Sequence, residues 1–228
     1  MPTTVSCVVP VHNGERYLGE TLRSMLAQTH PPLEIIAVDD GSVDASVALA
    51  RSFGPPVIVI AQERGGPPSA RNRGIRAARG DYVALCDQDD LFAPEKLAHQ
   101  VARFAARPTL DICLSTAENF WEPGLEHERA HYEAVGRTRA THHLGTMLVR
   151  RSVFDRIGLL DETRPAVEHV EWFARVADAG LSVEILPEVL LHRRMHITSM
   201  SHRATSPEPY LDFLRDRITA RRADRRTG

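Results

Sequence analysis

The sequence predicts an α/β protein built on a mostly parallel central sheet with helices on both faces. Its 228 residues, 43% of them hydrophobic, are enough to fill one core. The first hundred residues alternate between short apolar runs, typical of strands buried on both faces, and longer runs with helical periodicity. Repeated strand–helix units of this kind build a parallel sheet with right-handed connections, so we expect a single domain over residues 1–228.

The first part of the chain contains four such units. Residues 4–11 form an apolar run suited to a buried strand, and residues 14–28 then place Leu18, Leu22, Met25 and Leu26 on one helical stripe. The next units pair predicted strands with predicted helices at 33–40 and 43–53, 56–63 and 69–80, and 81–88 and 94–108.

From residue 110 onward the pattern is looser. The expected elements are strands at 111–119, 145–151 and 181–188, a helix at 169–180, and a helical tail that frays at its end. Residues 119–141 are interpreted as a polar, partly irregular excursion. Residues 191–203 are interpreted as a loop rich in His and Arg that follows the last strand.

The charge balance argues against a nucleic-acid partner. Lys and Arg number 28 against 30 Asp and Glu, so no overall positive field draws the chain to a polyanion. No run approaches the roughly 20 apolar residues that a membrane helix needs, and the first apolar run is too short for a signal peptide. Cys7, Cys86 and Cys113 each lie in an apolar run, which suits packing residues in a reducing compartment. We therefore expect a cytoplasmic protein.

The C-terminal tail is rich in arginine. A basic amphipathic helix can dock on anionic lipid, but Asp212, Asp216 and Asp224 interrupt this one. We favour a solvated terminus over peripheral contact with a membrane.

Polar clusters follow three of the predicted strands. They are "PVHN" at 10–13, "DDGS" at 39–42 and "DQDD" at 87–90. In open α/β sheets the carboxyl ends of the strands meet at one edge, where ligands bind. "DDGS" alone is better interpreted as a turn that caps a helix. "DQDD" is more telling, because its three carboxylates repel one another unless a cation is present, and Mg²⁺ or Mn²⁺ prefers such oxygen ligands.

Two long segments now carry a family resemblance. "VSCVVPVHNGERYLGETLRSMLAQTHPPLEIIAVDDGSVDAS" followed by "GGPPSARNRGIRAARGDYVALCDQDDLFAPEKL" resembles the nucleotide-binding half of family 2 glycosyltransferases, which have the glycosyltransferase-A fold. "HLGTMLVRRSVFDRIGLLDE" and the helix after it resemble the acceptor half more loosely. The resemblance implies a nucleotide-sugar-binding half at 3–109, an acceptor half at 110–203, and a C-terminal helix and basic tail at 204–228.

The resemblance also implies the reaction. Family 2 enzymes transfer a sugar, here expected to be a hexosyl group from a UDP-sugar or related nucleotide-sugar, to an acceptor hydroxyl. A single displacement inverts the anomeric configuration, and Mn²⁺ or Mg²⁺ assists it. The acceptor and the oligomeric state are not predicted.

Residue roles follow from the same resemblance. Pro10 and His12 would line the nucleobase pocket, Asp39 would accept the uracil N–H, Arg71 would help to hold the nucleotide, and Asp87 would meet the ribose.

A second group of residues would serve the metal and the diphosphate. Asp89 would ligate the metal, and the late His196 would complete its site. The pair Arg193 and Arg194 would cover the diphosphate. The pair His142-His143 is interpreted either as acceptor-side ligands or as ordinary loop residues, and we prefer the latter.

The catalytic base departs from the family pattern. The usual Glu-Asp pair at the start of the acceptor-half helix is here Glu168-His169. Three interpretations stay open: His169 is the base with Glu168 beside it, which we favour; Glu168 or Glu171 takes over; or the chain is a catalytically weak module that binds a nucleotide-sugar. A nucleotidyltransferase is a further class, but "PVHNGERY" is a poor phosphate loop.

Overall fold

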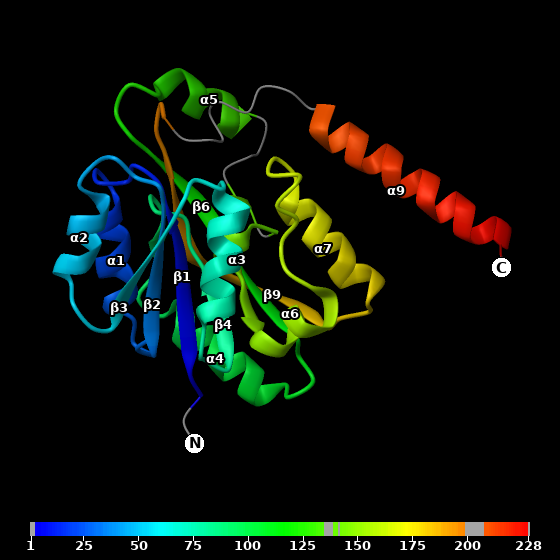
Figure 1. Ribbon diagram of the computed structural model, residues 1–228, viewed down its shortest axis with the longest axis horizontal. Coiled ribbons are helices and arrows are strands. Elements are labelled where there is room, and N and C mark those ends of the chain that lie inside the picture. The colour runs from blue at the N-terminus through cyan, green and yellow to red at the C-terminus, as the bar shows by residue number, and fades with distance from the viewer. Residues whose placement is uncertain (1–2, 135–138, 141, 199–207, 228) are drawn as a thin grey trace.

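A mixed sheet runs through the centre of the protein (Figure 1). The computed structural model describes residues 3–134, 139–140, 142–198 and 208–227. Within these residues the sheet has nine strands in the order β3-β2-β1-β4-β8-β6-β9-β5, with β7 paired to β6. The predicted α/β class is therefore confirmed.

The first four strands form the parallel half of the sheet. They are β1 (Val5–Val11), β2 (Glu34–Asp40), β3 (Val57–Gln62) and β4 (Tyr82–Leu85), connected by α1 (Leu18–Leu26), α2 (Ser46–Ser52) and α3 (Pro67–Ala77). Strands β1 and β2 are almost wholly buried, which explains their continuous apolar sequence. Their parallel register pairs Val11 with Asp39, so the polar residues after both strands lie at one edge.

The second half of the sheet mixes directions. Its elements are β5 (Leu91–Phe92), α4 (Lys96–Ala106), β6 (Ile112–Trp121), α5 (Glu126–Ala134), β7 (Arg139–Ala140), β8 (Leu148–Arg150), α6 (Arg151–Ile157), α7 (Glu168–Asp178), β9 (Val183–Met195) and α9 (Glu208–Thr227). Strand β8 pairs antiparallel with β4 and β6, whereas β6 and β9 are parallel.

Two expectations about this half are wrong. The segment at 191–203 does not begin as a loop, because β9 continues to Met195 and pairs with β6 as far as Trp121. For the same reason the start of the expected irregular stretch at 119–141 is strand. Residues 199–203 lie outside the described residues. The extension forms because the two strands satisfy each other's backbone groups, which the polar side chains at 192–194 do not indicate.

Helices cover both faces of the sheet, as expected. On one face, Leu18 and Leu22 of α1 and Leu97 of α4 pack on strand residues such as Cys7. On the other face, Ile75 of α3, Phe154 of α6 and Trp172 of α7 pack together with strand residues such as Val8. The sheet thus lies between two apolar layers, and its edges remain for polar groups.

The three cysteines are packing residues, as the sequence suggested. Cys7, Cys86 and Cys113 are free and buried. Burial raises the pKa of Cys7 and of Cys113 to about 12, so both remain thiols. As for membrane insertion, none of the helices described here is both long and apolar enough to cross a bilayer.

Hydrogen bonds of Asn72 connect helix α3 to the segment before α7. Asn72 of α3 donates to the carbonyl of Leu160 at 2.9 Å and to Glu162 at 2.8 Å, and it accepts from the N–H of Leu160 at 3.0 Å. Together with the β4–β8 pairing, these hydrogen bonds position the start of α7 near the carboxyl ends of the parallel strands.

Candidate active site

The strand ends bring the predicted polar clusters together. The N–H of His12 donates to Gln88 at 2.8 Å, and the Gln88 amide donates back to the His12 carbonyl at 3.1 Å. This pair of bonds fixes the segment after β1 against the segment after β4. On the other side, the imidazole Nδ1 of His12 lies 2.9 Å from the carbonyl oxygen of Asp40.

The two adjacent aspartates after β2 have different surroundings. Asp40 accepts from the N–H groups of Gly65 and Gly66 at 2.7 and 2.9 Å. Burial raises the pKa of Asp40, but these bonds outweigh it and hold the pKa below its usual value. Asp40 therefore fixes the loop before α3. Asp39 accepts only the N–H of Ser42, at 3.2 Å, among the hydrogen bonds of the described residues. Its carboxylate is the one suited to a ligand.

Arg71 links carboxylates from the two halves of the chain. One terminal nitrogen lies 2.6 Å from Asp87, and the other lies 3.0 Å from Glu168. The side chain is 4% exposed, and its Nε has no hydrogen-bond partner among the described residues. Arg71 therefore touches carboxylates rather than solvent, and its effect on a ligand passes through Asp87 and Glu168.

The same ion pairs influence the pKa values of both carboxylates. Burial raises the pKa of Asp87, but the Arg71 charge outweighs it, so the pKa falls to about 2. For Glu168 the balance is reversed: burial raises the pKa, and Arg71 offsets only part of the rise.

His169 lies beside Glu168 and is half-buried at the start of α7. Burial and the charge of Arg71 lower the pKa of His169 below its ordinary value. The imidazole is therefore neutral at pH 7, and one ring nitrogen has a lone pair that can accept a proton.

Asp89 and His196 meet although 107 residues separate them. The His196 Nε2 lies 2.8 Å from the Asp89 carboxylate, and its Nδ1 lies 2.8 Å from the Thr198 hydroxyl. The extension of β9 brings His196 to this position. A carboxylate is the ligand that Mn²⁺ or Mg²⁺ prefers, and imidazole is a common metal ligand in proteins.

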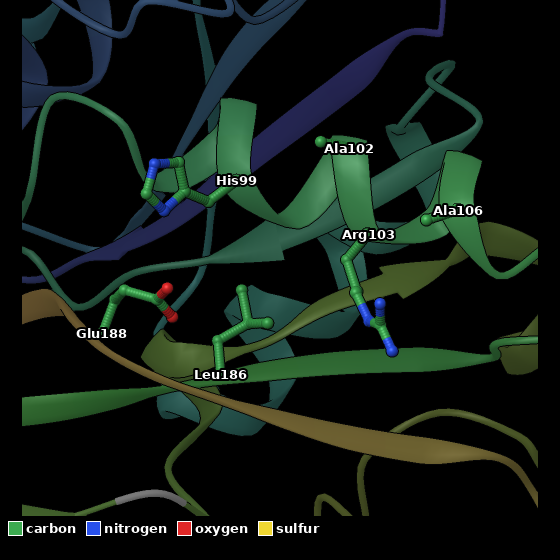
Figure 2. Close-up of a pocket in the computed structure, with 6 residues that line it drawn as sticks. All are labelled: His99, Ala102, Arg103, Ala106, Leu186 and Glu188. Carbon is green, nitrogen blue, oxygen red and sulfur yellow. The ribbon is translucent and has the colours of Figure 1, made fainter.

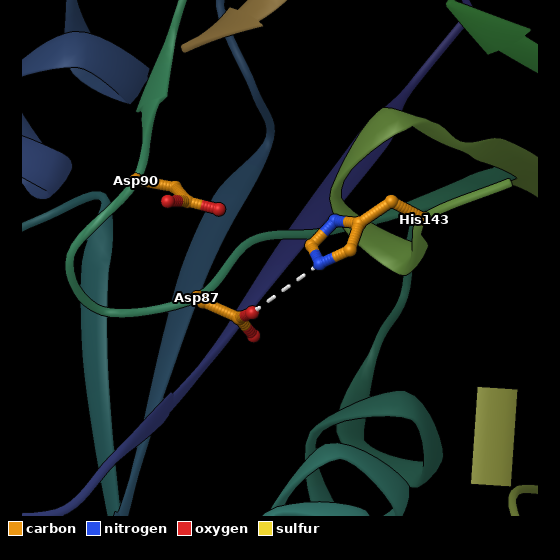
Figure 3. Close-up of side chains that lie close together, drawn as sticks. All are labelled: Asp87, Asp90 and His143. Atoms are coloured by element: carbon orange, nitrogen blue, oxygen red, sulfur yellow. Dashed lines mark ion pairs between the residues drawn. The ribbon is translucent and has the colours of Figure 1, made fainter. Parts of the chain in front are cut away.

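A second group of possible ligands lies close by (Figure 3). Donor atoms of Asp87, Asp90 and His143 all lie within 4.8 Å of one another, and the His143 Nε2 is 3.8 Å from Asp87. Burial and the charges of Asp87 and Asp89 raise the pKa of Asp90 well above its ordinary value. A divalent cation would relieve this repulsion, so the carboxylates of the "DQDD" turn fit a cation.

His143 has a different role in the arrangement seen here. Its Nδ1 accepts the N–H of Gly145 at 3.1 Å, so the proton of the neutral ring is on Nε2, which faces Asp87. Burial and the charge of Arg193 lower the pKa of His143 to about 3 and keep the ring neutral. His143 thus points its Nε2 toward Asp87 from 3.8 Å away, which our preference for an ordinary loop residue did not anticipate. His143 lies in a short turn before β8, and no motif in the sequence indicates that this turn faces the site.

The two arginines at the end of β9 differ. The Arg194 guanidinium bonds to Glu20, to Glu122 at 2.8 Å and to the Asp89 carbonyl at 3.1 Å. All three of its nitrogens are in use, which corrects the expectation that Arg194 covers the diphosphate: it fixes β9 to the "DQDD" turn. Arg193 lies near enough to influence the pKa of Asp87 and of His169, so it remains the candidate for the diphosphate.

A hollow elsewhere on the surface contains none of the predicted site residues. It measures about 290 Å³ and lies between α4 and β9 (Figure 2). Its lining is His99, Ala102, Arg103, Ala106, Leu186 and Glu188. The predicted residues gather instead at the carboxyl ends of β1, β2, β4 and β9 and at the start of α7.

Comparison with known proteins agrees with this geometry. Residues 6–159 match a family model described as "Glycosyl transferase family 2". The chain is 31% identical over 205 residues to a Rickettsia typhi protein named as an uncharacterized glycosyltransferase, covering 84% of this chain and 64% of the relative.

Solved structures share the fold. The structure resembles a crystal structure of S. aureus TarS 1-349 in complex with UDP, with a TM-score of 0.68 and 21% identity over 92% of this chain and 63% of that one. A TarS 1-349 structure in complex with UDP-GlcNAc has a TM-score of 0.69 and 20% identity over 90% of this chain and 61% of that one. The likeness confirms the glycosyltransferase-A fold. The chain spans less than two thirds of the length of each of these proteins.

Proposed function

The chain belongs to glycosyl transferase family 2, and we propose that it transfers a hexosyl group from a UDP-sugar to an acceptor hydroxyl with inversion at the anomeric carbon. The observation that carries the proposal is the Asp87–Arg71–Glu168 link, which joins the strand ends to the start of α7. A donor held at the strand ends would thereby face the Glu168-His169 pair. The titles of two TarS structures name UDP and UDP-GlcNAc, which supports UDP as the nucleotide.

On the donor side, we assign the nucleobase to the pocket beside Pro10 and His12, with Asp39 as acceptor for the uracil N–H. Asp87 would accept from the ribose, because its low pKa of about 2 keeps it ionised. Arg71 would act by holding Asp87 in place, and Arg193 would pair with the diphosphate.

Asp89 and His196 would hold Mn²⁺ or Mg²⁺, with Asp87 and Asp90 as neighbouring carboxylates. When bound, the ion neutralises negative charge on the diphosphate leaving group.

On the acceptor side, His169 is proposed as the base. The acceptor oxygen forms a bond to the anomeric carbon, and the bond from that carbon to the diphosphate oxygen breaks. The hydroxyl proton passes to His169, and the bonding electron pair leaves with the nucleoside diphosphate. Glu168, which is held by Arg71, would orient the histidine and offset its positive charge once it is protonated.

The first experiment tests donor and metal together. UDP with Mn²⁺ should raise the melting temperature, with a gain of about 2.7 kcal/mol at a hundred times Kd. UDP in chelator should give no increase, and neither should Asp89→Asn with both ligands. Asp155→Asn, an exposed position on α6, is the matched control and should behave as wild type. Equal stabilisation by UDP in chelator contradicts the metal assignment.

The second experiment is a panel of nucleotide-sugars scored by release of the nucleoside diphosphate. Turnover of a UDP-hexose, reduced in His169→Ala, supports the enzyme. Donor binding without turnover of any donor supports the alternative, a nucleotide-sugar-binding module, which the Glu168-His169 pair motivates.

A further inference from the structure

Tyr17, in the turn that leads into α1, is buried beside the proposed cation site. Its side chain is 7% exposed, and the centre of its ring lies 4.7 Å from the centre of the His196 imidazole, with the two rings tilted by 46°. Tyr17 thus contacts a predicted metal ligand, although it was not itself among the predicted site residues.

The backbone holds Tyr17 firmly at the start of α1. Its N–H donates to the Gly14 carbonyl at 3.0 Å, and its own carbonyl accepts from the N–H of Thr21 at 3.2 Å. The next residue, Leu18, is fully buried in the core. The Tyr17 ring is therefore attached to a rigid part of the fold, whereas His196 follows the last residue of strand β9.

The same ring also contacts Arg194. The Arg194 guanidinium lies 4.6 Å from the centre of the Tyr17 ring and 4.6 Å from the centre of the Phe120 ring, where a cation is attracted to an aromatic face. Residues 194 and 196 are two positions apart, so in an extended chain their side chains lie on one side. Tyr17 therefore packs against the end of β9 at two points.

His196 needs a support other than Asp89 when a cation is bound. Its Nε2 lies 2.8 Å from the Asp89 carboxylate, and its Nδ1 lies 2.8 Å from the Thr198 hydroxyl. A ring nitrogen that ligates a metal uses its lone pair and carries no proton, so it cannot donate to a carboxylate at the same time. The contacts that still orient the imidazole are those with Thr198 and with the Tyr17 ring.

The Tyr17 hydroxyl takes no part in these contacts. It is buried and has no hydrogen-bond partner among the residues that the structure describes. The contacts with His196 and Arg194 are made by the ring, so the ring and the hydroxyl can be tested separately.

We propose that Tyr17 is a positioning residue for the cation site, and that its ring orients the His196 imidazole for the metal that Asp89 also binds. Groups that orient a metal ligand typically change metal affinity by a factor of about 10 to 100. The proposal rests on the proposed function, because it presupposes the metal site at Asp89 and His196.

The test measures the melting temperature of the full chain at a fixed concentration of UDP while Mn²⁺ is increased. Each variant is compared with itself in UDP and chelator, so that stability lost with the side chain is subtracted. Tyr17→Leu should raise the Mn²⁺ concentration that gives half of the maximal shift about tenfold. Tyr17→Met, which also lacks a ring but fills more of the space, should show the same rise. Wild-type values in both variants overturn the proposal.

Tyr17→Phe separates the ring from the hydroxyl. It keeps the ring contacts, so its half-maximal Mn²⁺ concentration should stay close to that of wild type. If Tyr17→Phe behaves like Tyr17→Leu, the hydroxyl is the active group and the proposal is wrong.

Tyr82 provides the matched control. It is also 7% exposed, its ring centre lies 4.4 Å from that of Phe104, and the Arg150 guanidinium lies 5.3 Å from its ring. It is the first residue of β4, at the opposite end of that strand from the site. Tyr82→Leu should lower the metal-free melting temperature and leave the half-maximal Mn²⁺ concentration unchanged. An equal rise in Tyr82→Leu and Tyr17→Leu would show that any lost packing weakens the metal, and would overturn the proposal.

A double-mutant cycle tests whether Tyr17 acts through His196. In a His196→Ala background, Tyr17→Leu should cause little further rise in the half-maximal Mn²⁺ concentration, because the ligand that it orients is already absent. A second rise as large as the first would show that Tyr17 acts independently of His196, against the proposal.

Failure of this proposal and failure of the proposed function give different results. A wild-type chain that shows no thermal shift with UDP and Mn²⁺ contradicts the proposed function. A wild-type chain that shows the shift, together with a Tyr17→Leu variant that needs no more Mn²⁺, contradicts the role of Tyr17 alone.

Discussion

Arg71 shows how much of the candidate site depends on one side chain. Its sequence context, "ARN" on a helix, suggested a direct ligand of the nucleotide. The structure instead surrounds it with Asp87 and Glu168 and leaves it 4% exposed. It pairs with both carboxylates, lowers the pKa of Asp87 and offsets part of the rise that burial causes in the pKa of Glu168.

This predicts a large loss of stability in Arg71→Met. Two carboxylates would lose their partner, which costs about 3–5 kcal/mol for a buried pair. We expect the lower end of this range, because Asp87 is 27% exposed and water can replace part of the interaction. The measurement is the free energy of unfolding in urea. Arg73→Met, an exposed position on the same helix, should change it by less than about 0.5 kcal/mol, and an equal effect of the two substitutions would refute the prediction.

His169 gives a prediction about rate and pH. Removal of a general base costs about 10² to 10⁴ in kcat, so His169→Ala should show a loss in this range. A base must be deprotonated, and burial lowers the pKa of His169 from 6.5. In wild type the midpoint of the acidic fall of kcat/KM should therefore lie below pH 6.5. His99→Ala, in the separate hollow of Figure 2, is the matched control. If the acidic limb of the pH profile is unchanged in His169→Ala, the base is another group.

At the scale of elements, the sequence predicted best where local pattern and tertiary environment agree. The four strand–helix units of the first half have apolar runs because their strands are buried on both faces. Strand β9 was predicted to end near Glu188, because the next residues are polar. Its continuation depends on pairing with β6, which lies far away in the sequence, so no local pattern could reveal it.

Gly74 illustrates an element that is fixed by close packing. A Cβ at this position would lie 2.2 Å from a methyl group of Val8 and 3.2 Å from one of Val38. Alanine would gain about 1 kcal/mol of helix propensity, but overpacking costs about 1–3 kcal/mol, so Gly74→Ala should be destabilising. Gly19→Ala is the control, because its nearest contact is 3.4 Å, to the flexible end of Arg23. Melting temperatures measure both, and a higher value for Gly74→Ala would contradict the packing argument.

Lys96, the first residue of helix α4, has an unexpected environment. A lysine in a first turn normally reaches solvent, but this one is fully buried. Its Nζ donates to Gln100 at 2.7 Å and lies 4.5 Å from the centre of the Phe92 ring. Burial lowers the pKa of Lys96 to about 8.

This pKa predicts a stability change with a definite sign. Between pH 8 and about 10 the unfolded chain binds the lysine proton more tightly than the folded chain, so the free energy of unfolding gains on the order of 2 kcal/mol as pH rises. The buried thiols act in the opposite direction, because burial raises their pKa values. The difference between wild type and Lys96→Met, which have the same thiols, isolates the lysine. The free energy of unfolding of wild type relative to Lys96→Met should increase from pH 8 to pH 10. A difference that stays constant over this range would contradict the lowered pKa of Lys96.

At the scale of the whole molecule, the site is assembled from distant segments. The sequence indicated the nucleotide side, because its carboxylates follow predicted strands directly. The family resemblance indicated that His196 would join Asp89 at the metal site, but nothing in the sequence indicated that His143 would face Asp87, since this contact spans 56 residues and depends on how the second half folds back on the first. Arg194 was misjudged for the same reason: its partners Glu20 and Glu122 are distant in sequence.

The joined sheet predicts that both halves unfold together. Strand β4 pairs with β1 on one side and with β8 on the other, so hydrogen bonding continues from the parallel half into the mixed half. Asn72 and Arg71 add buried polar contacts across the same boundary. Neither half can separate without exposing these groups, each at a cost of about 1–3 kcal/mol.

The two tryptophans, Trp121 and Trp172, both belong to the second half. Their fluorescence should therefore change at the same urea concentration as the far-UV circular dichroism of the whole chain. Asn72→Ala should lower this shared midpoint without splitting it, whereas two separate transitions in wild type would show that the chain consists of two domains.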